Sequence, residues 1–152
     1  MQTACTRKVC RIIMKAKSFH CSKSGVAQPI AAAIGTKLQC VCDKLPPAYP
    51  SDGEKVVFVG VEMKGSVPGP VEQFCKDLTP ARTKYVAFYV INGTGDTSGL
   101  DGVIATMEKN GVKKVGETLG ITVKSSLFHK GTVTEADIQK AIDWATKIIE
   151  TP

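Results

Sequence analysis

The sequence predicts an α/β fold with three layers, in which helices cover both faces of a five-stranded parallel sheet. Residues 85–91, and residues 55–61 after Lys55, are continuously apolar, as expected for central parallel strands that are buried on both faces. Segments with helical periodicity alternate with these two and with three further strand-like segments. Because crossovers between parallel strands are right-handed, five strands of this kind favour the strand order 2-1-3-4-5.

The first predicted elements are a strand, a helix and a second, short strand. We expect the first strand in the second half of residues 9–19, the helix at residues 25–34 and the second strand at residues 38–42. Pro29 falls in the first turn of the helix, where its missing N–H is tolerated. Gly35 is a plausible residue to end that helix.

A connection with three prolines follows, and the remaining elements come after it. Residues 43–53 have room for at most one helical turn, around residues 47–49, because proline is excluded from helix interiors. Thr134 and Asp137 have the spacing of a capping box before the last helix, and Trp144 beside its apolar face is expected to pack in the core. The elements predicted here are strands at residues 55–61, 85–91 and 112–118, helices at residues 70–78, 100–110 and from residue 134 onward, and an irregular tail at residues 119–131.

The length and the charge set limits on the class of protein. A chain of 152 residues suits a single domain, in which residues 1–11 form a basic extension. An apolar content of 43% is typical of a globular protein, and no apolar run is long enough to span a membrane. The whole net charge of +6 arises in residues 1–42, which hold seven Lys or Arg and no Asp or Glu. This excess either steers an anionic ligand or an acidic partner, or belongs to a tail without a role. Nucleic acid is not expected as a partner, because aromatic residues are only 6% of the chain and do not alternate with the basic ones.

The six cysteines are predicted to be reduced thiols of a cytoplasmic protein. The N-terminus lacks the apolar segment of a signal peptide, so we expect no disulfides. The cysteines form no C-x-x-C pair and have no His at zinc spacing, so we expect no metal site. Cys40, Cys42 and Cys75 suit small apolar positions in the core. Cys21 differs from these, because a thiol beside Lys23 at a helix N-terminus would have a lowered pKa and be reactive.

Three loops rich in Gly, Ser or Thr follow the first, third and fourth predicted strands. They are the first loop (residues 20–27), the second loop (residues 62–69) and the third loop (residues 92–99). The carboxyl ends of parallel strands share one edge of a sheet, and ligands of such sheets bind there, where the strand order reverses. The loops at the opposite edge are not rich in these residues, so the asymmetry predicts a binding edge.

The first loop is the main candidate for an anion site. It contains the sequence Ser-Lys-Ser-Gly-Val-Ala at residues 22–27. At the start of a helix the backbone N–H groups are unpaired and the helix dipole is positive, so hydroxyls, a lysine and a glycine placed there can cradle an anion. The alternative is a simple turn in which Ser24 caps the helix. The presence of two similar loops at the same edge favours the anion site.

The three loops, in this order and spacing, resemble those of the flavodoxin family over about residues 12–150. In that family the first loop reads approximately [TS]-x-[TS]-G-N-[TS] and holds the phosphate of FMN, and residues 22–27 match its first half. Residues 60–71 resemble the second loop, where an aromatic residue precedes a glycine, and residues 93–98 resemble the third loop, G-x-G-D-[ST]-[ST]. The resemblance implies a short-chain flavodoxin-like fold with noncovalently bound FMN. The cofactor-binding residues that it implies are Ser22, Lys23, Ser24, Gly25, Val26, Ala27, Met63, Lys64, Gly65, Asn92, Gly93, Thr94, Gly95, Asp96 and Gly99.

The chain departs from this family pattern at the phosphate and at the flavin ring. Val26 and Ala27 replace an Asn and a hydroxyl residue, and each lost hydrogen bond to a charged phosphate is worth roughly 1.5–3 kcal/mol. Lys64 or Met63 stands where one aromatic would stack on the ring, and Gly99 stands where a Tyr would cover the other face. Lys64 is either a cation that raises the flavin potential or a solvated loop lysine.

The resemblance implies an electron carrier, in which FMN does the chemistry and passes electrons to a redox partner protein. The basic excess in residues 1–42 favours an acidic partner. Because a fold does not determine a function, two alternatives stay open. One is a flavin-free or weakly binding accessory domain of the same fold, and the other is an FMN-dependent NAD(P)H or quinone reductase. No catalytic residue is predicted, since His20 and His129 have no evident carboxylate partner in the sequence. Asp96 either bonds the backbone of the ligand loop or caps the helix that follows.

Overall fold

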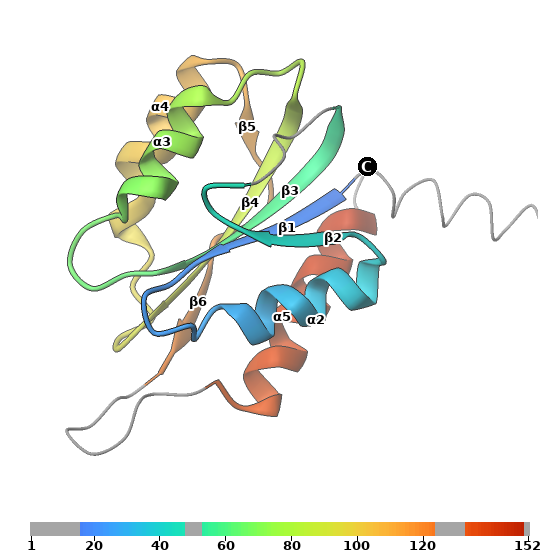
Figure 1. The fold of residues 1–152 in the computed structure, drawn as a ribbon, viewed down its shortest axis with the longest axis vertical. Coiled ribbons are helices and arrows are strands. Elements are labelled where there is room, and N and C mark those ends of the chain that lie inside the picture. The colour runs from blue at the N-terminus through green and yellow to red at the C-terminus, as the bar shows by residue number, and fades with distance from the viewer. Residues whose placement is uncertain (1–15, 48–52, 124–132, 151–152) are drawn as a thin grey trace, which may run out of the picture.

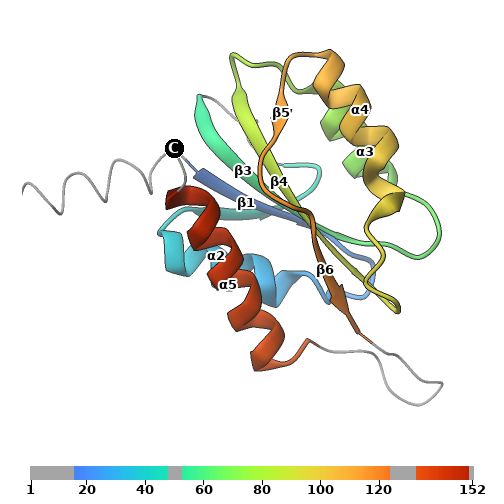
Figure 2. The same ribbon diagram turned by 180° about the vertical axis from the view of Figure 1, so that it is seen from behind.

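A parallel sheet with helices on both faces forms the protein, in a computed structural model that describes residues 16–47, 53–123 and 133–150 (Figure 1). Figure 2 shows the same arrangement from behind. The strands are β1 (Ala16–Cys21), β2 (Val41–Lys44), β3 (Glu54–Glu62), β4 (Thr83–Asn92), β5 (Lys113–Lys114) and β6 (Leu119–Thr122). The helices are α2 (Gln28–Leu38), α3 (Gly69–Asp77), the 3-10 turn η1 (Ser98–Leu100), α4 (Asp101–Lys109) and α5 (Glu135–Glu150).

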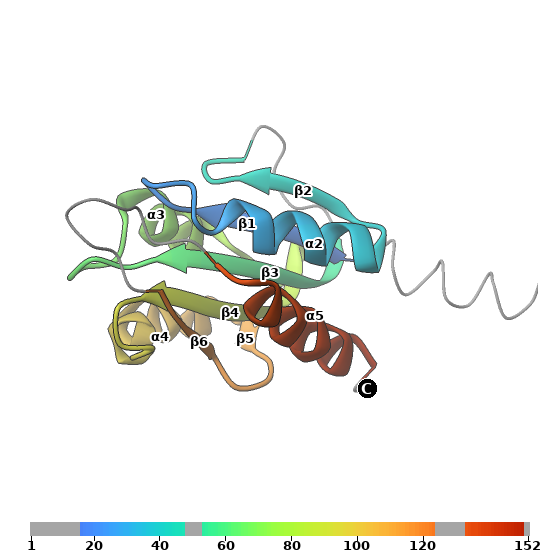
Figure 3. The same ribbon diagram turned by 90° about the horizontal axis from the view of Figure 1, so that it is seen from below.

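The strand order is β2-β1-β3-β4-β5, and every pairing is parallel, so the predicted order is confirmed. Helices α2 and α5 lie on one face of the sheet and α3 and α4 on the other (Figure 3). The strands β3 and β4 are buried on both faces, which explains why their sequences are apolar without alternation. The fold is therefore the three-layer α/β architecture that the sequence predicts.

Helix α2 begins and ends later than predicted. Gly35 does not end the helix but is buried inside it, and a Cβ added there would lie 3.2 Å from the Cβ of Cys42. The glycine thus allows α2 to pack closely against the start of β2, and Gln39 instead takes the left-handed conformation at the helix end, with φ 53°. As a result the second strand is Val41–Lys44 rather than residues 38–42.

The strand predicted at residues 112–118 is shortened to β5, and a second short strand, β6, follows it in the segment predicted to be irregular. Both β5 and β6 pair with β4, and Gly116 lies between them with φ +71°. This left-handed residue turns the chain out of the extended conformation, and the backbone returns to β4 at Leu119. The prediction of an irregular tail from residue 119 is therefore wrong for β6, which lies in the sheet.

The start of the last helix and the position of its tryptophan are confirmed. The N–H of Thr134 donates to Asp137 Oδ2 at 3.0 Å, and the N–H of Asp137 donates to Thr134 Oγ1 at 3.2 Å, which is a capping box. Trp144 packs edge-on against Phe58 and Tyr89, with ring centroids 5.7 and 5.9 Å away. Its indole N–H donates to the carbonyl oxygen of Glu117 at 2.9 Å.

Several predictions concern residues outside the described part of the chain. These are the basic extension at residues 1–11, the turn around residues 47–49, and the roles of Cys5, Cys10 and His129. Among the helices that the structure describes, none is both long and apolar enough to cross a lipid bilayer.

Candidate functional site

The three loops meet at one end of the sheet, where β1, β3 and β4 finish (Figure 1). The parallel register places Cys21 beside Val61, and Glu62 beside Ile91, so the loops leave neighbouring strands at the same level. The strand order reverses at β1, because the chain continues to β2 on one side of β1 and then crosses to β3 on the other side. The structure thus brings the predicted loops together at the position where ligands of open α/β sheets bind.

A hydrogen bond to the side chain of Ser22 closes the first loop. Its Oγ accepts the backbone N–H of Ala27 at 3.2 Å, and α2 begins one residue later. Ala27 is the residue before the helix, so Ser24 does not cap α2 as one interpretation proposed. Val26 and Ala27 are buried in the core against α2 and α5, so only their backbone could contact a ligand. Gly25, with φ +83°, makes the sharp turn between the exposed and buried halves of the loop.

Ser24 and Glu62 form the main polar contact of the site. The hydroxyl of Ser24 donates to Glu62 Oε2 at 2.6 Å, and the Ser24 backbone N–H donates to Glu62 Oε1 at 3.0 Å. Both oxygens of the carboxylate are therefore held by a single residue, 38 positions away in the sequence. The backbone N–H of Lys23 makes a further bond to the same carboxylate. The first loop thus binds an anion, and that anion is a side chain of the protein.

The pKa of Glu62 reflects this contact. Partial burial acts to raise the pKa, but the hydrogen bonds from Ser24, the positive charge of Lys64 and the bond from Lys23 outweigh it, and the pKa lies below its ordinary value. Glu62 is therefore a carboxylate at neutral pH. Lys64 contributes only through its charge, because its side chain is exposed in the second loop.

Cys21 does not have the lowered pKa that the sequence predicts. Burial is the main cause that raises its pKa, and the negative charge of nearby Glu62 raises it further. The prediction of an activated thiol is wrong because burial raises the pKa of Cys21, and Glu62, which the local sequence does not reveal, adds a negative charge beside it. Of the other described cysteines, Cys75 is buried as predicted and its pKa is raised by burial to about 12, whereas Cys42 is exposed on the edge strand β2. Cys40 is half-buried before β2.

Asn92 organises the third loop. Its Oδ1 accepts the backbone N–H groups of Thr94 and Gly95, and its Nδ2 donates to the carbonyl oxygen of Asp96 at 2.8 Å. Asp96 accepts both the N–H and the hydroxyl of Ser98 at 3.0 Å, and the bonds from Ser98 hold its pKa below the ordinary value. The residue before the next helical turn is Thr97 and not Asp96, so these contacts favour the interpretation in which Asp96 bonds the backbone of the third loop.

Strand β6 packs directly against the backbone of the third loop. A Cβ added to Gly120 would lie 2.2 Å from the carbonyl oxygen of Gly95, so the loop backbone rests directly on the strand. Gly95 itself has φ +80°, and a Cβ there would lie 2.9 Å from Thr122 Oγ1. Glycine is thus required at both positions, on the loop and on the strand below it. Gly93 and Thr94 are exposed at the tip of the loop.

A hollow of about 250 Å³ lies between the second and third loops. It is lined by Met63, Gly65, Asn92, Thr94, Asp96 and Gly99. None of these six residues is aromatic, and Met63 fills the space beside Gly99, since a Cβ added to Gly99 would lie 2.4 Å from the Cε of Met63. The hollow is therefore lined by one thioether side chain, two glycines and three polar residues.

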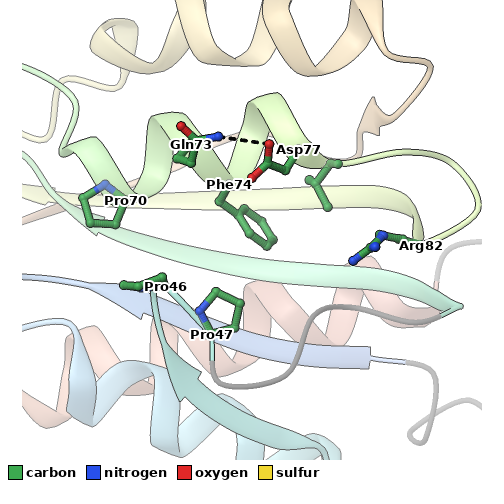
Figure 4. Close-up of a pocket in the computed structure, with 8 residues that line it drawn as sticks. Pro46, Pro47, Pro70, Gln73, Phe74, Asp77 and Arg82 are labelled. Carbon is green, nitrogen blue, oxygen red and sulfur yellow. Dashed lines mark hydrogen bonds between the residues drawn. The ribbon is translucent and has the colours of Figure 1, made fainter.

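A second hollow, of about 170 Å³, runs beside α3 and contains none of the predicted site residues (Figure 4). Pro46, Pro47, Phe74 and Leu78 make it largely apolar. Figure 4 shows Phe74 pointing from α3 into this hollow and Arg82 at one end of it. All of its lining residues lie outside the three loops, so we place the candidate site at the loops.

The sequence reasoning missed Glu62 and Gly120, which both shape the site. Glu62 lies in the predicted second loop, and the sequence assigns it no role. The signal that identifies it is its position as the last residue of a buried apolar strand. A carboxylate there must face the loop of the adjacent strand β1, where donors are available. Gly120 lay in the segment interpreted as irregular, and no local pattern distinguishes it.

No protein-family model matches the chain, and no curated protein sequence matches it. Three solved structures match with TM-scores of 0.65, 0.69 and 0.68: oxidised flavodoxin 2 from Bacillus cereus, a flavodoxin from the domain Archaea, and a short-chain flavodoxin associated with a non-canonical PDU bacterial microcompartment. Their identities to this chain are 18%, 20% and 13%, and the matches cover 91%, 90% and 91% of it. They cover 99%, 97% and 98% of the flavodoxin chains. The chain therefore has the flavodoxin-like fold, as the sequence predicts.

Proposed function

We propose that this protein binds FMN noncovalently at the three loops and passes electrons to a partner redox protein. The observation that carries the proposal is that the three loops meet where the strand order reverses, and that the second and third loops enclose a hollow of about 250 Å³ there. The first loop lies beside them, and its Ser24 donors hold the carboxylate of Glu62. The similarity of the fold to three flavodoxins supports the choice of FMN as the ligand.

In this proposal the flavin ring occupies the hollow between the second and third loops. Met63 would contact one side of the ring, and the backbone of Gly65 and Thr94 would contact its polar edge. The flavin supplies one- and two-electron chemistry when bound, and the chain orients it. Lys64, which is exposed in the second loop, would favour the anionic reduced form through its charge.

The choice of an acidic redox partner is supported by the charge of the chain. The net charge is +6, and the excess lies in residues 1–42, which also contain the first loop. A positive charge excess of this kind would speed the approach of an acidic protein and make its association sensitive to salt.

An absorption spectrum before and after the addition of FMN tests the proposal. We expect a flavin spectrum that shifts on binding, with a dissociation constant in the micromolar range, since stacking aromatics are missing from the ring site. A colourless protein that leaves the FMN spectrum unchanged at high micromolar concentration would overturn the proposal. NAD(P)H oxidation by the loaded protein, without a partner, would identify an enzyme instead of a carrier.

The second candidate is a flavin-free or weakly binding accessory domain with the same fold. It is favoured by the contact between Ser24 and Glu62, because a carboxylate held at 2.6 Å occupies the donors that a phosphate would need. The absence of aromatic residues among the six that line the hollow favours it as well. The absorption experiment separates the two candidates directly.

A further inference from the structure

Glu62 lies at the junction of two of the three loops. It is the last residue of β3, and its side chain reaches across to the first loop after β1. The register of β1 with β3 ends at Cys21 and Val61, so Glu62 is the first residue of β3 beyond the paired part. Its carboxylate is therefore fixed by the sheet at the entrance to the anion site.

An incoming phosphate would need the same hydrogen atoms that Glu62 accepts. Ser24 has one backbone N–H and one hydroxyl hydrogen, and both point to the carboxylate. Two anions that compete for one set of donors also repel each other at this distance. The cations nearest in the loops, Lys23 and Lys64, are both exposed and screened by solvent, so neither offsets the repulsion fully.

We infer that Glu62 determines ligand specificity at this site. Its carboxylate occupies the position that a flavin phosphate would take, so a phosphorylated flavin gains no affinity from its phosphate. The inference rests on the proposed function for the claim that the ligand is a flavin. The competition between a phosphate and the carboxylate involves only Ser24 and Glu62. In the wild-type protein the phosphate adds nothing to binding, and FMN and riboflavin bind with equal affinity. Removal of the carboxylate converts the first loop into a phosphate site.

Titrations with FMN and riboflavin test the inference. In the wild type we expect a ratio of dissociation constants, riboflavin over FMN, of about 1, since only the shared ring and ribityl chain bind. In Glu62→Ala the ratio should rise at least tenfold, because a charged acceptor regains two donors. Glu62→Gln, which keeps the shape of the side chain without its charge, should give an intermediate ratio and serves as the variant if the alanine protein does not fold.

Two further variants serve as controls. Glu72→Gln removes a carboxylate from an exposed ion pair with Lys76 on α3 and should leave the ratio at its wild-type value. Ser24→Ala added to Glu62→Ala removes the hydroxyl donor and should reverse most of the gain. A wild-type ratio already above ten, or a ratio in Glu62→Ala that stays near the wild-type value, would overturn the inference.

Inorganic phosphate gives a second readout that does not depend on flavin. At constant ionic strength, millimolar phosphate should raise the unfolding temperature of Glu62→Ala and leave that of the wild type unchanged. Equal shifts in both proteins, or no shift in either, would contradict a role for Glu62 in excluding phosphate. If no variant binds any flavin, the proposed function fails, and the phosphate result alone then decides the inference about Glu62.

Discussion

Single residues in this structure act through contacts that lie far away in the sequence. Tyr89 is fully buried between β3 and α5, and its ring takes the space that Gly60 leaves open, where an added Cβ would lie 2.1 Å from the ring. The hydroxyl of Tyr89 is buried without a hydrogen-bond partner among the described residues. Burial raises the pKa of this hydroxyl far above its ordinary value, so it stays protonated.

Tyr89→Phe is expected to leave the protein equally stable or to stabilise it by up to about 1 kcal/mol, because it removes a buried polar group without a partner. Urea unfolding measures the change in the free energy of unfolding. Tyr85→Phe, in the half-buried part of the same strand, is the matched control. A loss of more than about 1 kcal/mol in Tyr89→Phe would show that the hydroxyl has a bonding partner, such as water.

Glu62 links the stability of the protein to pH. Its folded-state pKa is below the ordinary value of 4.5, so at acidic pH the unfolded chain binds more protons than the folded chain does. The contribution of Glu62 to the free energy of unfolding is therefore lost as the pH falls. We expect the free energy of unfolding of the wild type to fall more steeply between about pH 5 and 3 than that of Glu62→Gln. Ser24→Ala, which keeps the carboxylate but removes a donor, should give a slope between the two. Identical slopes for wild type and Glu62→Gln would contradict the hydrogen bonds to Ser24.

At the level of elements, the second loop and the start of α4 together form the proposed ring site. Met63 packs in the core formed with α3 and α4, and its end covers Gly99, just before Leu100 leads into α4. Because the blocking atom is the end of a flexible side chain, a larger residue at position 99 can displace it. The stacking surface of the hollow is therefore adjustable.

Gly99→Tyr is expected to tighten FMN binding about three- to tenfold, since an aromatic stacking contact is worth roughly 0.5–1.5 kcal/mol beyond its area. Fluorescence quenching of FMN measures the affinity. Gly102→Tyr adds the same ring one turn along, where an added Cβ meets nothing within 4 Å, and should leave the affinity unchanged. Equal effects of the two variants would show that the ring binds elsewhere.

The last helix depends on its capping box. Thr134→Ala removes the acceptor for the Asp137 N–H and should destabilise the protein by about 1 kcal/mol, measured by thermal or urea unfolding. Thr106→Ala, within α4, removes a hydroxyl that bonds only the Gly102 carbonyl oxygen and should have a smaller effect. A Thr134→Ala protein as stable as the wild type would mean that α5 is held by its apolar face alone.

At the level of the whole molecule, the sequence was sufficient for the layers, the strand order and the edge that carries the loops. The apolar runs of β3 and β4 and the capping box at Thr134 are local patterns, and local patterns can be read from one chain. The contact of Ser24 with Glu62, across 38 residues, is a property of the register and has no local signal. The place of Gly35 inside α2 and the existence of β6 are not predicted for the same reason, because close packing between elements decides their conformations.

The support of the third loop by β6 extends the site beyond the residues that touch a ligand. Gly120 lies under the Gly95 carbonyl oxygen and does not line the hollow, yet any side chain there would lift the loop. Directed evolution for tighter or altered ligand binding should accordingly recover substitutions along Leu119–Thr122 as well as in the loops. A mutational library confined to the lining residues would miss the support on which their geometry depends.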